Sequence, residues 1–129
     1  MEVTNVNYKE INPGILAYLG DAVYELEIRK YLVQKSNAKI NDMDKEAIKY
    51  VSAINQSKIL DDLIDKNILT EEELNCVTRA RNYKPHSKPR YVDIKTYKKA
   101  TALEALFGML YLYNNIERIN EIIKEIKGE

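Results

Sequence analysis

Two acidic residues four positions apart are the first feature of this sequence whose types and spacing could do chemistry. Asp21 and Glu25 lie in the run LAYLGDAVYE, which spans residues 16–25. Residues four apart stand on one face of a helix, where two carboxylates repel each other unless a cation lies beside them. A solvated acidic face would explain this pair taken by itself. However, aspartate is a poor helix former and Gly20 costs about 1 kcal/mol relative to alanine, which favours a role other than helix stability.

A third acid, Glu104, is the only charged residue in the run ATALEALFGML, which spans residues 100–110. A helix that is apolar on nearly every side is expected to be buried. A buried carboxylate is costly and must be neutralised, paired or bound to a cation. The residues leave open a hydrogen-bonded core glutamate, a partner for a lysine, and a metal ligand.

Small residues beside these acids predict that the two helices cross closely. A crossing at these positions would bring Asp21 and Glu104 to a shared point. Carboxylate oxygens, few in number and supplemented by water, suit Mg²⁺, or Mn²⁺ as a substitute, rather than Zn²⁺. Such a cation can activate a water and stabilise the charge that develops on a phosphate during in-line displacement. The small residues are Ala17, Gly20 and Ala22 in the first run and Ala100, Ala105 and Gly108 in the second.

A strongly basic segment precedes the second acidic run. Residues 79–99 carry eight lysines and arginines against one acid, Asp93, a local net charge of +7, although the whole chain has a net charge of zero. Such side chains, interleaved with tyrosine and histidine, can follow a phosphate backbone without reading bases. A purely solubilising role is the alternative, and the position beside the proposed metal site argues against it. The basic residues are Arg79, Arg81, Lys84, Lys88, Arg90, Lys95, Lys98 and Lys99.

The composition disfavours several other kinds of site and location. Cys76 is the only cysteine and His86 the only histidine, so an internal disulfide and a thiolate metal site are excluded, and a Cys-His catalytic pair lacks its usual orienting context. No apolar run approaches the roughly 20 residues that span a bilayer, and the first residues do not resemble a signal peptide. We therefore expect a cytoplasmic protein with no membrane partner.

The elements that must position the acids are predicted to be helices. Asn12 and Pro13 indicate a helix start, because the amide caps free backbone N–H groups and proline lacks the N–H that would be unsatisfied there. One long helix is expected from there to about Gln34. Its apolar positions recur at helical spacing and are Leu16, Leu19, Val23 and Leu26.

Further helix starts follow in the middle of the chain. Asn41 and Asp42 supply a cap and negative charge for a helix that is expected to break into two near Asn55. Thr70 and Glu73 have the spacing of a capping box, which predicts the start of the next helix.

The last third of the chain is predicted to contain one loop and two helices. Two prolines and the lack of apolar periodicity indicate a loop over residues 82–93. A helix through residues 96–114 and a final amphipathic helix that ends at Gly128 would complete the chain. The sequence therefore predicts an all-α fold and a single domain over residues 1–129.

Both acidic runs resemble motifs of a known enzyme family. Residues 19–25 (LGDAVYE) resemble the ribonuclease III signature, and residues 102–108 (ALEALFG) resemble that family's second acidic motif. The resemblance extends over nearly the whole chain, with the motifs in the same order and spacing. The lack of a separate double-stranded-RNA-binding domain, together with residues 79–97, is similar to the mini-ribonuclease III subgroup.

The resemblance implies an all-helical endonuclease domain that acts on double-stranded RNA as a homodimer. Asp21 and Glu104 would be catalytic residues and Mg²⁺ ligands, with one site per RNA strand and products that carry 5′ phosphates and 3′ hydroxyls. In the subgroup the substrate is a stem of precursor 23S ribosomal RNA, and a large-subunit ribosomal protein is a further candidate partner. The basic segment would hold that stem, since A-form RNA is recognised by shape and phosphates. The RNA-binding candidates are Arg79, Arg81, Lys84, Lys88, Arg90, Lys98 and Lys99.

The sequence departs from the family pattern at two positions. Ala17 and Thr101 stand where full-length ribonuclease III has a glutamate and an aspartate. Glu25, Thr101 or water would fill the vacant coordination positions, so Glu25 and Thr101 are accessory candidates. For Tyr18, beside the motif, we favour packing over substrate contact. The alternative functions are a catalytically silent helical RNA-binding or ribosome-associated module and, third, a purely structural interaction protein.

Overall fold

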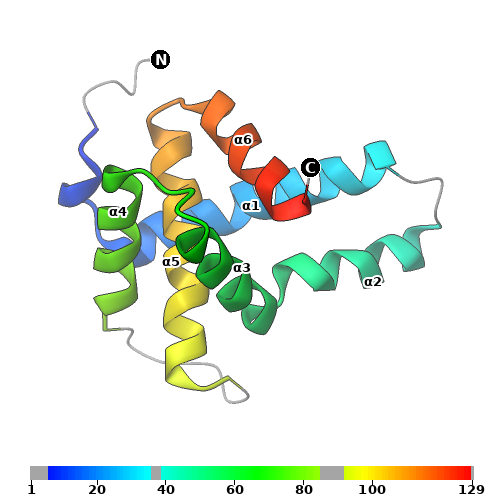
Figure 1. Cartoon of the computed structure of the whole chain (residues 1–129), viewed down its shortest axis with the longest axis horizontal. Coiled ribbons are helices and arrows are strands. Elements are labelled where there is room, and N and C mark those ends of the chain that lie inside the picture. Colours follow the sequence, from blue (N-terminus) through cyan, green and yellow to red (C-terminus); the bar gives the residue numbers. More distant parts are fainter. Residues whose placement is uncertain (1–5, 36–38, 85–91, 129) are drawn as a thin grey trace.

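Helices form every regular element in the part of the chain that the structure describes. The computed structural model describes residues 6–35, 39–84 and 92–128. No helix within these ranges is long and apolar enough to cross a membrane. The predicted all-α fold is confirmed (Figure 1). In order, the elements of these ranges are the short 3-10 helix η1 (Tyr8–Glu10) and the α-helices α1 (Pro13–Lys35), α2 (Ile40–Val51), α3 (Ala53–Asp65), α4 (Glu71–Asn82), α5 (Ile94–Leu112) and α6 (Ile116–Lys127).

Local capping side chains set the starts of α1 and α4, which the sequence predicted, and of α5, which begins two residues before the predicted start at residue 96. The side chain of Asn12 accepts a backbone N–H at 2.7 Å in the first turn of α1. Thr70 and Glu73 form the expected capping box at the start of α4. Asp93 accepts the Thr96 N–H at 2.9 Å at the start of α5. Each cap satisfies a backbone donor that the helix itself leaves free.

The α2 and α3 boundaries differ from the prediction. The helix α2 begins at Ile40, so Asn41 lies inside its first turn and does not cap it. The break between α2 and α3 falls at Ser52, three residues before the expected Asn55. Ser52 is in an extended conformation and its hydroxyl accepts the Asn55 N–H at 3.2 Å, which makes serine the cap. The Asn55 side chain instead donates to the Ile48 carbonyl at 3.1 Å, across the break.

The central element of the fold is α5. Figure 1 shows α1 running across it, α3 and α4 beside it, and α6 following from its end. Nearly every α5 side chain between Ala100 and Leu110 is buried, as the apolar run predicted. Phe107 meets Tyr24 of α1 edge to face, with ring centroids 5.1 Å apart. Glu104 is therefore carried by a helix that lies in the middle of the core.

Two glycines let α1 and α5 cross in backbone contact. A Cβ placed on Gly20 would lie 1.6 Å from the Glu104 carbonyl oxygen. A Cβ on Gly108 would lie 2.1 Å from the Leu16 carbonyl oxygen. Any side chain at either position would therefore overlap the facing backbone. The close crossing that the small residues predicted is confirmed, and it sets Glu104 beside Gly20, the neighbour of Asp21.

Candidate active site

Asp21 and Glu104 line one cavity of about 230 Å³ at the crossing of α1 and α5. Asp21 comes from the first half of α1, and Glu104 comes from the middle of α5. The end of α4 and the first turns of α5 close the remaining sides. The predicted convergence of the two acids on a shared point is therefore present in the structure. The other lining residues are Gly14, Ala17, Tyr18, Ala80, Tyr83, Tyr97, Lys98 and Thr101.

The Glu104 carboxyl group holds its proton more tightly than usual, first because it is buried and second because Asp21 lies beside it. Burial raises the pKa of Glu104 to about 8, and both a hydrogen bond with Asp21 and the charge of Asp21 act in the same direction. A hydrogen bond from Gln56 lowers the pKa of Glu104 but does not outweigh them. At neutral pH the pair therefore retains a proton on Glu104. A divalent cation can take the place of this proton, because it neutralises both carboxylates.

The two accessory candidates differ in position. Thr101 lines the cavity, and its hydroxyl donates to the Tyr97 carbonyl at 2.9 Å, one helical turn back. Its oxygen retains lone pairs that can accept a hydrogen bond from a water. Glu25 does not line the cavity and forms an ion pair with Arg29 on the exposed side of α1. Glu25 lies outside the cavity because α5 crosses α1 five residues earlier, at Gly20, and its accessory role stays a prediction.

The site is poor in metal-ligating side chains, as the sequence indicated. In the described ranges, no group of three or more histidine, cysteine, aspartate and glutamate side chains could hold a metal ion. Ala17 lines the cavity where the family pattern has a glutamate. Any cation held by Asp21 and Glu104 would therefore complete its coordination with water or hydroxyl oxygen. Mg²⁺ commonly retains several waters in this way.

Among the RNA-binding candidates that lie in the described residues, Arg79 and Lys99 have partners within the protein. Arg79 donates to the carbonyl oxygens of Tyr8 and Ile11 at 3.2 and 2.9 Å, so it fastens the N-terminal segment to α4. Lys99 forms an ion pair with Asp61 of α3 at 3.0 Å. Neither residue lines the cavity. These contacts give both side chains a structural role, and RNA contact by them stays a prediction.

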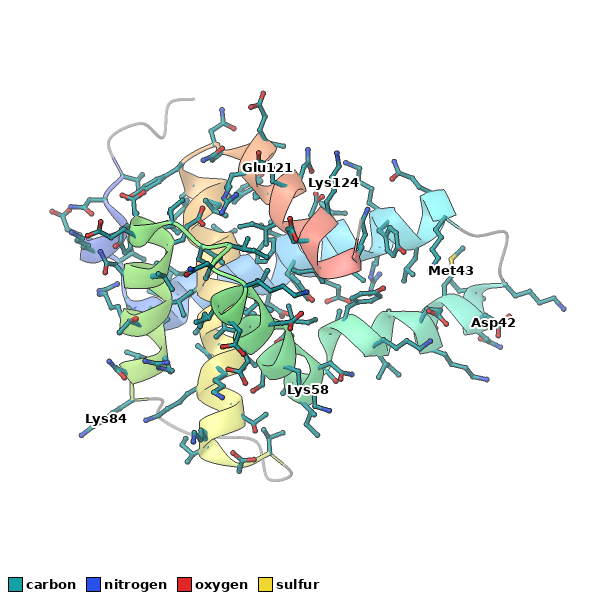
Figure 2. The ribbon with its side chains drawn as sticks, viewed as in Figure 1. Asp42, Met43, Lys58, Lys84, Glu121 and Lys124 are labelled. Carbon is teal, nitrogen blue, oxygen red and sulfur yellow. The ribbon has the colours of Figure 1, made fainter. Side chains whose placement is uncertain are left out.

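The remaining basic candidates lie nearer to the cavity or outside the described residues. Lys98 lines the cavity itself. Arg81 and Lys84 are exposed at the end of α4, where Figure 2 shows Lys84 extending away from the fold. Lys88 and Arg90 lie outside the described residues. Among the described candidates, Lys98 is therefore the one that shares the cavity with the two acids.

Three tyrosines on the cavity wall were missed or misread in the sequence. Tyr18 is 84% exposed, so the predicted packing of this side chain does not occur within a single chain. Tyr83, directly after α4, and Tyr97, in the first turn of α5, also line the cavity. Part of the signal is in the sequence, because Tyr83 and Tyr97 are among the aromatic residues interleaved with the basic side chains of residues 79–99.

Comparisons with known proteins identify the relationship of this chain. A family model described as Ribonuclease III domain matches residues 15–115, which include both cavity acids. The chain belongs to the ribonuclease III family. This confirms the resemblance of the two acidic motifs and, with the helices above, the expected fold.

Relatives and a solved structure extend the ribonuclease III match over most of the chain. The chain is 40% identical over 118 residues to a Mini-ribonuclease 3 of Staphylococcus aureus, covering 92% of this chain and 88% of that one. It is 46% identical over 122 residues to a Mini-ribonuclease 3 of Brevibacillus brevis, covering 92% and 90%. A crystal structure of a protein from Fusobacterium nucleatum superimposes with a TM-score of 0.82 at 36% identity, over 100% of both chains. A single domain over residues 1–129 with no separate RNA-binding domain stays a prediction.

Proposed function

We propose that this protein is a metal-dependent endoribonuclease that cleaves double-stranded RNA and matures the ends of precursor 23S ribosomal RNA. The observation that carries the proposal is the meeting of Asp21 and Glu104 in one cavity of a ribonuclease III-type fold. The relatives named Mini-ribonuclease 3 support ribonuclease chemistry for this chain. The products would carry 5′ phosphates and 3′ hydroxyls, as the family resemblance implies.

The donor set of the cavity fits Mg²⁺, or Mn²⁺ as its substitute. Asp21 and Glu104 supply hard carboxylate oxygens. The pair retains a proton because a second negative charge is unfavourable there, and a bound cation would neutralise that charge in place of the proton. Thr101 would orient a water in the coordination shell through its hydroxyl. The bound cation would supply an activated water and stabilise charge on the phosphate. The protein's own part is to hold the two carboxylates together on rigid, crossing helices.

The RNA backbone would be held by the basic side chains around the cavity opening. Lys98 lies in the cavity and would contact the phosphate nearest the cleaved bond. Arg81 and Lys84, exposed at the end of α4, would contact phosphates farther along the strand. Contacts of this kind recognise the shape of an A-form duplex and do not read bases in its deep groove.

A homodimer would place one such site on each strand of the duplex. Ile15, Tyr18 and Leu26 of α1 form an exposed apolar stripe, here called the α1 stripe, with exposed fractions of 61%, 84% and 65%. They recur at helical spacing on one face, beside the cavity that Tyr18 also lines. An exposed apolar stripe of this kind supports a contact with a second copy. A large-subunit ribosomal protein as a further partner and a cytoplasmic location stay predictions.

The second candidate function is a catalytically silent RNA-binding or ribosome-associated module. A module of this kind has no need of a carboxylate pair, and removing one acid would relieve repulsion without loss of function. The pairing of Asp21 with Glu104 in a solvent-accessible cavity favours the enzyme.

The deciding experiment is cleavage of a long duplex RNA and of a stem made from the two ends of precursor 23S RNA. Wild type, Asp21→Asn and the control Asp42→Asn would each be assayed with Mg²⁺ and with chelator. Asp42 is exposed near the start of α2, away from the cavity (Figure 2). We expect wild type and Asp42→Asn to cut only with Mg²⁺, and folded Asp21→Asn to bind RNA without cutting. RNA binding without cleavage by all three proteins would favour the silent module.

A further inference from the structure

Gln56 of α3 is a buried amide in contact with the candidate active site, although no sequence signal singled it out. Its side chain is only 3% exposed. Its amide donates a hydrogen bond to the Glu104 carboxylate. Gln56 does not line the cavity that Glu104 shares with Asp21. It therefore reaches the acid from the protein interior and not from solvent.

The position of Gln56 on α3 is one at which an apolar residue would be expected. Leu60 and Leu63, four and seven residues later, are buried on the same face of α3. An amide at such a position costs free energy unless it is hydrogen-bonded. Glu73, another long polar side chain buried to this degree in the described ranges, has a structural partner in Arg118. The partner of Gln56 is instead a residue of the candidate site.

Two neighbouring helices restrain the Glu104 carboxyl group. Asp21 of α1 and Gln56 of α3 each hydrogen-bond to it, and α1 and α3 both pack against α5. The contribution of Gln56 differs from that of Asp21, because an amide donor stabilises the charged carboxylate, whereas a neighbouring carboxyl stabilises the protonated form. A neutral donor also brings no positive charge that would repel a cation. Gln56 is thus suited to orient an anionic Glu104.

We propose that Gln56 is a positioning residue whose amide holds the Glu104 carboxylate in the orientation that binds a divalent cation together with Asp21. The inference rests on the proposed function, because it requires the Asp21–Glu104 cation site. Hydrogen-bond partners behind metal ligands change metal affinity or activity by about 10–100-fold when they are removed. Gln56 acts through Glu104 alone, since it does not face the cavity.

The test is Mn²⁺ binding to the whole chain without RNA, measured from the electron paramagnetic resonance signal of free Mn²⁺. The Gln56→Met variant keeps the length of the side chain and removes the donor. The matched control is Leu60→Met, which alters packing one turn away on the same buried face. We expect the Mn²⁺ Kd to rise about tenfold or more for Gln56→Met and to stay close to wild type for Leu60→Met. With RNA, kcat should fall for Gln56→Met while KM stays unchanged.

Other results would overturn the proposal in distinguishable ways. An unchanged Mn²⁺ Kd in Gln56→Met, or an equal rise in Leu60→Met, would reduce Gln56 to a packing role and leave the proposed function standing. Wild type that binds no Mn²⁺ would remove both the cation site and this inference.

A measurement on wild type covers the case in which Gln56→Met does not fold. The chain contains two glutamines, and Gln34 is exposed at the end of α1. In nitrogen-15 NMR spectra, addition of Mg²⁺ should shift the side-chain amide resonances of Gln56 and leave those of Gln34 in place. Gln56 resonances that do not move while Mg²⁺ binds would contradict the proposal.

Discussion

The carboxyl group of Glu104 is the residue-scale feature that links the site to pH. Burial raises the pKa of Glu104 to about 8, and Asp21 reinforces this effect through a hydrogen bond and its charge. In the unfolded chain the same group has the ordinary value of 4.5. The folded protein therefore binds a proton that the unfolded chain releases over most of the neutral range. A cation must displace this proton, so metal binding should strengthen as pH rises toward and beyond about 8.

We predict that, in chelator, the free energy of unfolding falls as pH rises from 4.5 to about 8. The sign follows because the folded state binds more protons than the unfolded state throughout this window. The loss should be roughly 2–4 kcal/mol, since one pKa unit corresponds to about 1.4 kcal/mol and partial exposure weakens the effect. Urea denaturation at several pH values would measure it. Glu104→Gln should abolish the slope and Glu25→Gln should keep it; equal slopes in wild type and Glu104→Gln would contradict the assignment.

At the scale of the element, capping patterns made some helix boundaries predictable and left others open between neighbouring residues. The start of α4 and the end of α6 follow from the Thr70–Glu73 capping box and Gly128, which sequence patterns reveal. The break before α3 was misplaced because Ser52 and Asn55 are both good caps and only the backbone decides between them. Gln56 was missed because an uncharged residue without a motif is distinguished only by its burial.

Roles of the basic residues show the same limit of sequence reasoning. Arg79 belongs to a basic segment, yet it bonds to carbonyl oxygens 68 and 71 residues earlier in the chain. Lys99 lies next to Lys98, yet it turns to Asp61 of α3 while Lys98 lines the cavity. Charge content predicts a basic surface, but only packing decides which side chains are left to face a ligand.

Replacing Gly20 with alanine should separate α1 from α5 and weaken the site. The new Cβ would lie 1.6 Å from the Glu104 carbonyl oxygen, which is backbone and cannot rotate away. We predict a loss of about 3 kcal/mol or more in the free energy of unfolding, together with weaker Mn²⁺ binding. Gly14→Ala is the matched control, because its Cβ would meet the side chains of Asn12 and Tyr83. Equal melting temperatures for the two variants would refute the backbone contact.

Arg118 joins α6 to the start of α4, and its removal should be costly. Its guanidinium group pairs with the buried Glu73 carboxylate at 2.7 Å and donates to the Ile68 carbonyl at 2.7 Å. Arg118→Met should lower the free energy of unfolding by about 3–5 kcal/mol, because it leaves a buried charge without its partner. Chemical denaturation would measure the loss. Adding Glu73→Gln should restore part of it, and a double variant less stable than Arg118→Met would count against this explanation.

At the scale of the whole molecule, the α1 stripe predicts self-association. A dimer would have about twice the 15.0 kDa mass of one chain. We expect light scattering to give that mass for wild type and the mass of one chain for Leu26→Lys, because burying a lysine in an apolar contact is unfavourable. Ile116→Lys is the control, since Ile116 is an exposed apolar residue of α6. A wild-type mass of one chain would exclude a stable dimer.

The glycine crossing of α1 and α5 also has a consequence for how the protein loses activity. Many active sites lie on loops that open locally while the rest of the fold stays intact. Asp21 and Glu104 lie instead on two helices whose backbones touch at Gly20 and Gly108, so the acids separate only when the core itself opens. Backbone amides at the crossing should therefore be among the last to exchange their hydrogens with solvent. Inactivation by heat and global unfolding should then follow a single curve.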